Sequence, residues 1–224
     1  MSPRGELHGD VQKFMTGVYA WMTAGLGVTA AVIAGLSTSP ETVYMIAVGP
    51  LRWVFLVGVL AMAWILPAKI PTMDRPVAAG LFLVYSALIG AAISPIAFIY
   101  SIGSIASALC GTVGIFGVMA VLGFFTKKDL SGMGQFLIMA LVGAVIGSII
   151  NAIFLQSSMM GFIIAAAVAV ISAGLTAYYN QALKQMYMMH GGAGNLAING
   201  ALALYINFIN LFLSLLRLFG SSRN

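Results

Sequence analysis

Long apolar runs separated by short polar breaks make up almost the whole chain. A helix needs about 20 apolar residues to cross a bilayer, and seven runs approach or exceed that length, at roughly 15–36, 50–67, 77–97, 99–125, 134–155, 158–180 and 200–219. The breaks contain charges or turn formers such as Ser94-Pro95. The pattern predicts an all-α integral membrane protein with seven transmembrane helices in a membrane domain at 15–219, flanked by short tails at 1–14 and 220–224.

The composition supports this prediction. Of 224 residues, 61% are hydrophobic and 7% are charged, whereas soluble domains carry about 25% charged residues. The lipid bilayer is therefore the expected partner, and a separate soluble domain is excluded. The net charge of +5 does not indicate nucleic-acid binding, because the charges are scattered at the ends of the predicted helices.

The basic residues predict an orientation, since cytoplasmic loops hold an excess of Lys and Arg. With seven spans and the N-terminus inside, seven basic residues fall inside and three outside. The inside group is Arg4, Lys13, Lys69, Arg75, Lys127, Lys128 and Lys184, and the outside group is Arg52, Arg217 and Arg223. The N-terminus is predicted to be cytoplasmic and the C-terminus outside. Because the first 13 residues lack a cleavable signal pattern, the first span should remain as an anchor.

Small residues within the spans predict close helix packing, since small side chains let helices approach each other in lipid. They include Gly143 and Gly147, a GxxxG pair, and a series formed by Gly111, Gly114 and Gly117. The single cysteine, Cys110, lies in an apolar run and is expected to be a small buried hydrophobe.

A polar stripe marks the last span. Its members are Asn199, Asn207, Asn210, Ser214 and Arg217, whose spacing places them along one helical face. Polar side chains within a span usually face the bundle interior or a cavity. This helix is therefore expected at the centre of the bundle.

A shorter polar row on the sixth span holds Ser172, Thr176 and either Tyr179 or Asn180. Two interpretations of the two rows are open. Either they form hydrogen bonds between helices that fix the fold, or they line a gated polar path.

Enzymatic functions fit the sequence poorly. All five acidic residues fall in loops or the N-terminal tail, namely Glu6, Asp10, Glu41, Asp74 and Asp129. An intramembrane aspartyl protease needs carboxylates within its spans, and a serine hydrolase needs a base beside its nucleophile. The two histidines, His8 and His190, lie in the tail and in the loop before the last span. We expect no catalytic activity, no cofactor and no protein-bound metal site.

Several stretches resemble the transmembrane Bax inhibitor-1 motif family, particularly its bacterial members, over nearly the whole chain. The most specific are GLTAYYNQALKQMY and LYINFINLFLSLLRLFG, supported by the loop TKKDLSGMGQFL. Further matches are FMTGVYAWMTAGLGVTA, SPIAFIYSIGSIASA and NAIFLQSS. The resemblance implies seven helices, six of them surrounding a polar seventh, in the bacterial inner membrane.

The resemblance also implies a pH-sensitive calcium leak controlled by two aspartates, one on the sixth helix and one on the seventh. Two close carboxylates share a proton, which makes such a pair a switch. In this sequence Tyr179 and Asn207 occupy those positions. Asparagine does not titrate, and the pKa of tyrosine is about 10, so neither residue switches near neutral pH. Arg75 either takes the place of the arginine that partners the aspartates or is a simple topology charge.

Three functions therefore compete. The first is an ion leak along the seventh helix, with calcium as the transported ion and impaired or absent pH switching. The second is a regulatory protein that binds a membrane-anchored AAA protease through the tail up to Lys13, as bacterial relatives do. The third, a secondary transporter, is disfavoured because no repeat with broken helices is visible. Ion selectivity and oligomeric state are not encoded in any readable pattern.

Overall fold

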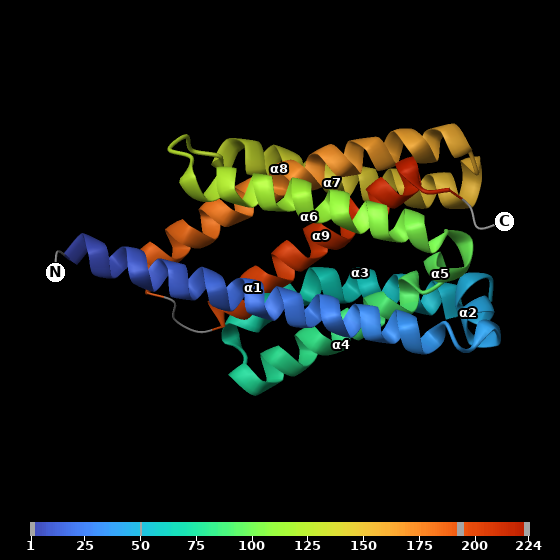
Figure 1. The fold of residues 1–224 in the computed structure, drawn as a ribbon, viewed down its shortest axis with the longest axis horizontal. Coiled ribbons are helices and arrows are strands. Elements are labelled where there is room, and N and C mark those ends of the chain that lie inside the picture. The colour runs from blue at the N-terminus through green and yellow to red at the C-terminus, as the bar shows by residue number, and fades with distance from the viewer. Residues whose placement is uncertain (1–2, 50, 192–194, 222–224) are drawn as a thin grey trace. The chain divides into compact units, whose positions relative to one another are not determined.

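The computed structural model describes residues 3–49, 51–191 and 195–221, and these residues are predominantly helical. The helices are α1 (Pro3–Leu36), α2 (Pro40–Ala47), α3 (Leu51–Lys69), α4 (Arg75–Ile93), α5 (Ile96–Ile99), α6 (Ile102–Phe125), α7 (Ser131–Ile150), α8 (Ser158–His190) and α9 (Leu196–Phe219) (Figure 1). A 3₁₀ turn, η1 (Ile70–Thr72), follows α3, and a π-helical turn, η2 (Asn151–Leu155), follows α7.

Within the described ranges, seven helical segments are long and apolar enough to cross a membrane, which confirms the predicted number. They are Gly9–Leu36, Leu51–Thr72, Arg75–Ile99, Ile102–Phe125, Ser131–Leu155, Ser158–Met189 and Leu196–Phe219. Two helices continue well beyond the apolar runs. The helix α1 already begins at Pro3, inside the expected tail, and α8 continues to His190 rather than ending near residue 180. Hydropathy detects where a helix becomes polar, whereas backbone hydrogen bonding continues past that point.

The chain forms two compact units, and α9 contributes to both. Unit 1 contains the chain up to Ile99 together with Met186–Tyr205. Within it α1 packs mainly on α4. Two glycines permit this close contact: a Cβ on Gly90 would lie 2.8 Å from the carbonyl oxygen of Thr29, and one on Gly25 would lie 2.6 Å from the Phe82 ring.

A buried polar cluster joins three helices of unit 1. The Thr29 hydroxyl lies 2.6 Å from the Tyr205 hydroxyl and donates to the carbonyl of Ser86 at 2.9 Å. Around it the rings of Phe82 and Tyr85 meet the Tyr205 ring edge-on, with centroids 5.7 and 6.2 Å away. Tyr205 is fully buried. These contacts fix the first half of α9 against α1 and α4.

Unit 2 contains Tyr100–Gln185 and Ile206–Ser222. Its helix α8 is seated against α6 and α7 by glycines. A Cβ on Gly123 of α6 would lie 2.6 Å from the Cα of Ala177, and one on Gly134 of α7 would overlap the Tyr178 ring. Gly174 of α8 receives the Leu137 side chain of α7. These glycines hold the Tyr178–Gln181 segment of α8 in a fixed place between its neighbours.

The glycines that pack closely are not the ones that the sequence pattern indicated. An added Cβ would meet nothing within 4 Å at Gly114, Gly117 or Gly143. It would meet only one side chain at Gly111 (Leu215, 3.6 Å) and one at Gly147 (Ile164, 3.8 Å). Cys110 is exposed rather than buried. The reason is common to all of them: in a membrane protein an apolar run also covers the lipid-facing surface, so apolarity does not indicate burial.

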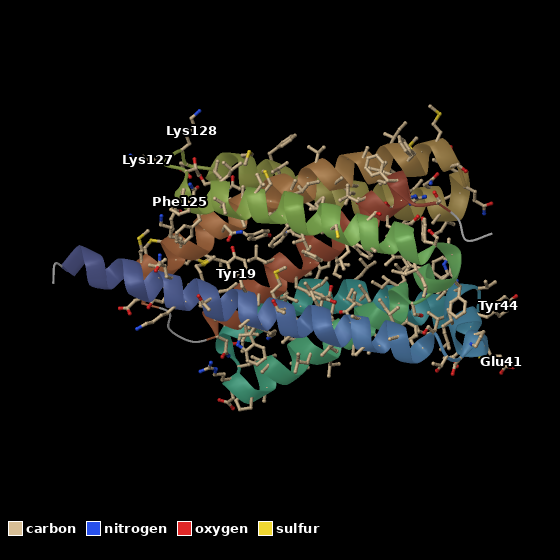
Figure 2. The ribbon with its side chains drawn as sticks, viewed as in Figure 1. Tyr19, Glu41, Tyr44, Phe125, Lys127 and Lys128 are labelled. Carbon is tan, nitrogen blue, oxygen red and sulfur yellow. The ribbon has the colours of Figure 1, made fainter. Side chains whose placement is uncertain are left out.

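The loop between α6 and α7 is held by one side chain of α8. The amide of Gln181 accepts from the Leu130 N–H at 2.8 Å and donates to the Lys128 carbonyl at 2.7 Å. Nearby, Lys184 donates to the Phe124 carbonyl at 3.0 Å. Lys127 and Lys128 are exposed and project outward from this loop (Figure 2).

Replacing Gln181 with alanine should loosen this loop, because it removes two hydrogen bonds, worth about 0.5–1.5 kcal/mol each. We expect several-fold faster tryptic cleavage at Lys127 and Lys128 in inverted membrane vesicles. Gln135→Ala is the matched control, since Gln135 is exposed on α7. Equal cleavage rates in the two variants would contradict the loop-holding role. Cleavage confined to inverted vesicles would also support the predicted orientation.

Candidate functional site

The polar row on α8 is completely buried, and Asn180 rather than Tyr179 completes it. Ser172, Thr176 and Asn180 are each 0% exposed, at spacings of four residues. The Thr176 hydroxyl donates to the Ser172 carbonyl at 2.8 Å, and the Asn180 amide donates to the Thr176 carbonyl at 2.8 Å. The Ser172 hydroxyl has no hydrogen-bond partner within the described residues. This row therefore offers at least one buried neutral oxygen.

The polar stripe on α9 runs from the interior of the helix to its last turn. Asn207 and Ser214 are 2% and 5% exposed, Asn199 and Asn210 are half-buried, and Arg217 is exposed. The helix is the most buried of the seven candidate spans, with 56% of its most apolar window buried against 39% or less in the others. Its position at the centre of six helices stays a prediction.

A cavity of about 160 Å³ lies within unit 2, between α7, α8 and α9. Four polar side chains line it: Ser148 of α7 and Asn210, Ser214 and Arg217 of α9. Its other walls are apolar and come from all three helices: Leu141, Val145, Ile164, Ala165, Val168 and Leu213. The cavity thus has both polar and apolar walls.

On both α8 and α9, the residues that line the cavity lie on the same helical face as the polar row of that helix. On α8, Ala165 and Val168 line it, and Ser172 follows one turn later on the same face. On α9, Asn210 lines it, and Asn207 precedes it by three residues, again on the same face. The structure therefore brings Asn210, Ser214 and Arg217 together, as the stripe predicted.

The two positions at which the resemblance implies an aspartate pair differ in burial. Tyr179 is half-buried, with its ring centroid 5.2 Å from that of Tyr178, and Asn207 is buried. The roles of Tyr179 and Asn207 as the two positions of a sensor pair stay predictions. Arg75 is exposed at the first turn of α4. Its role as a partner of this pair stays a prediction.

Two other parts of the chain are incompletely described. The side chain of His190, the last residue of α8, lies outside the described residues. So do the side chains before Gly9, which belong to the tail that the regulatory hypothesis depends on. That hypothesis and its AAA protease partner therefore stay predictions.

Metal binding by acidic or sulfur ligands finds no support in the described part of the chain, where no three His, Cys, Asp or Glu residues converge. The site instead presents hydroxyl and amide groups and one guanidinium. Neutral oxygens suit transient contact with a hard cation, whereas firm calcium binding commonly includes carboxylates.

Sequence reasoning missed two members of the site. Ser148 is a lone serine in the apolar run of α7, and no spacing rule selects it. Gly161 lies in the first turn of α8, and the Arg217 guanidinium rests against the place that its Cβ would occupy. Gly161 follows a short turn that is fixed by paired hydrogen bonds between Asn151 and Ser157 at 3.1 Å. This turn is the feature of the sequence that could have directed attention to Gly161.

Comparison with known proteins gives one consistent result. The family described as "Inhibitor of apoptosis-promoting Bax1" matches residues 11–224. Inner membrane protein YbhL of Escherichia coli (strain K12) is 40% identical over 222 residues, covering 95% of this chain and 93% of that protein. An uncharacterized protein of Deinococcus radiodurans is 40% identical over 219 residues, covering 96% and 93%. The chain is therefore a multi-pass membrane protein that belongs to the Bax inhibitor-1 family.

Proposed function

We propose that the protein is an ion leak of the bacterial inner membrane, with calcium as a transported ion and with little response to pH. The observation that carries the proposal is the cavity of about 160 Å³ that is lined by Ser148 of α7 and by the polar face of α9. In the membrane, polar side chains lining a cavity commonly mark an ion or substrate pathway. The inner-membrane location is inferred from the name of the Escherichia coli relative.

The pathway would use neutral oxygens throughout unit 2. Ser172, Thr176, Asn207, Asn210 and Ser214 supply hydroxyl or amide groups along the two rows. Such groups substitute for part of the hydration shell of a cation without holding it tightly, which conduction requires. Arg217, at one end of the α9 row, repels cations. We therefore expect a slow leak rather than a high-conductance channel.

The absence of carboxylates from the pathway predicts a flat pH profile. The sequence from residue 130 to the end contains no Asp or Glu, and none of the pathway side chains on α8 and α9 has an ordinary pKa near neutrality. We expect calcium flux into dye-loaded liposomes to change by less than about twofold between about pH 6 and about pH 8. A steep dependence would contradict the proposal, as would flux no greater than in protein-free liposomes.

A matched pair of threonines tests the route. Thr176 of α8 and Thr112 of α6 are both 0% exposed, and each donates to the carbonyl four residues earlier, at 2.8 and 2.7 Å. Thr176→Val should reduce the flux several-fold because it removes a hydroxyl from the polar row. Thr112→Val should leave the flux unchanged. Equal effects of the two substitutions would contradict a route along α8.

A further inference from the structure

Arg217 lies beside a second source of positive charge. Its guanidinium contacts the first turn of α8 at Gly161. The N-terminus of a helix carries about half a positive elementary charge, from its unpaired N–H groups. Arg217 also lies in the last turn of α9, where a cation complements that helix's own dipole. The contact with α8, however, places two positive groups together at one edge of the cavity.

No acidic side chain of this part of the protein balances that charge. The last acidic residue in the sequence is Asp129, in the loop between α6 and α7. This loop is at the end of α7 and α8 opposite the turn that joins them, whereas Arg217 contacts α8 beside that turn. Among the described residues Arg217 forms no ion pair and no hydrogen bond. Within the described residues its charge therefore remains available to an anionic ligand.

The cavity next to Arg217 supplies further donors. Ser214 is 5% exposed and lines the cavity beside Asn210 and Ser148. As for Arg217, no hydrogen bond connects these three side chains to any residue that the structure describes. A ligand with several acceptor oxygens would satisfy the hydroxyls, the amide and the guanidinium together.

The remaining walls indicate what else such a ligand contains. Leu141, Val145 and Val168 form apolar walls of the cavity. Outside it, Ile146 and Ile163 are each 53% exposed on α7 and α8, on a surface suited to hydrocarbon chains. A small soluble anion would leave these walls empty, whereas a lipid would cover them.

We propose that this cavity binds the phosphate of an anionic glycerophospholipid, with Arg217 pairing with the phosphate and Ser214, Asn210 and Ser148 donating to its oxygens. An acidic lipid is favoured over a zwitterionic one, because no carboxylate is present to bind an ammonium headgroup. The lipid site uses the same cavity as the proposed leak, but lipid binding does not require conduction, since it needs only the charge of Arg217 and the donors that line the cavity.

The test is lipid retention by the full-length protein in micelles containing equimolar phosphatidylglycerol and phosphatidylcholine, measured by native mass spectrometry. The natural protein should retain phosphatidylglycerol preferentially. Arg217→Gln should lower that preference by about tenfold, because a bidentate charge-assisted contact is lost. Ser214→Val, which keeps the charge and places an apolar side chain in the apolar-walled cavity, should lower it by a smaller factor and serves as the second variant if Arg217→Gln fails to fold.

The controls separate this site from general surface charge and from soluble phosphate. Arg52 is an exposed arginine whose guanidinium lies 5.6 Å from the Trp53 ring, so Arg52→Gln should leave the preference unchanged. Excess inorganic phosphate or glycerol 3-phosphate should not displace the lipid. The proposal is overturned if Arg52→Gln and Arg217→Gln have equal effects, if either soluble phosphate displaces phosphatidylglycerol completely, or if the natural protein shows no preference.

Discussion

Substituting alanine for Gly123 is expected to destabilise the protein by about 3 kcal/mol, since overpacking a tight contact costs about 1–3 kcal/mol and occasionally more. The new Cβ would overlap the carbonyl of Ala177 and lie 2.6 Å from its Cα. These are backbone atoms of α8, which no rotamer change moves away. The helices α6 and α8 must therefore separate. The measurement is the free energy of unfolding by SDS titration in mixed micelles.

The same helix provides the matched control. Gly117 lies six residues earlier on α6, and an added Cβ there meets nothing within 4 Å. Gly117→Ala should be neutral or should stabilise the helix by up to about 1 kcal/mol, because alanine has the higher helix propensity. If the two variants unfold alike, the close contact between α6 and α8 is not what Gly123 provides.

This pair shows why the fold was only partly predictable from the sequence. Hydropathy located seven spans because each must bury its backbone polar groups in lipid as a helix. It did not distinguish Gly123, which meets backbone, from Gly117, which faces open space. Both lie in apolar surroundings of similar composition. The difference depends on which helix lies opposite, and a one-dimensional pattern does not contain that information.

The candidate site was predictable to a similar degree. The spacing of Asn207, Asn210, Ser214 and Arg217 predicted one face of α9, and three of them do line one cavity. On α8 the spacing left Tyr179 and Asn180 as alternatives, and the structure buries Asn180. The two differ by about 100° around the helix, which a short row does not resolve. Ser148 was missed because a single polar residue in an apolar run forms no repeating spacing that would assign it to a helical face.

The hydrogen bonds by which Gln181 holds the loop between α6 and α7 were missed for another reason. Gln181 lies at the edge of the apolar run of α8, where a polar side chain looks like the end of a span. In the structure it is 6% exposed and binds two backbone groups more than 50 residues away in sequence. Hydrogen bonds between distant segments leave no local signal, so only the fold reveals them.

Introducing aspartates at the two positions that the resemblance assigns to the family's pair should create a pH response that the proposed leak does not have. In the double variant Tyr179→Asp with Asn207→Asp, two carboxylates would lie on the α8 and α9 segments of unit 2. Burial and mutual repulsion raise the pKa of at least one of them toward neutrality. As pH rises, the shared proton is lost and the ionised pair attracts cations. We expect calcium flux to rise by about fivefold or more between about pH 6 and about pH 8 in dye-loaded liposomes.

Tyr179→Asn, with Asn207 unchanged, is the matched control for this variant. It replaces the large ring by a side chain of the same size and shape as aspartate, but the resulting pair does not titrate. Its flux should therefore remain flat across the same pH range, even if the smaller side chain raises the overall rate. A flat profile in the double aspartate variant would show that these positions do not control the path. A profile that rises equally in both variants would show that the pH response does not come from the aspartate pair, because the control carries no proton at these positions that can be lost.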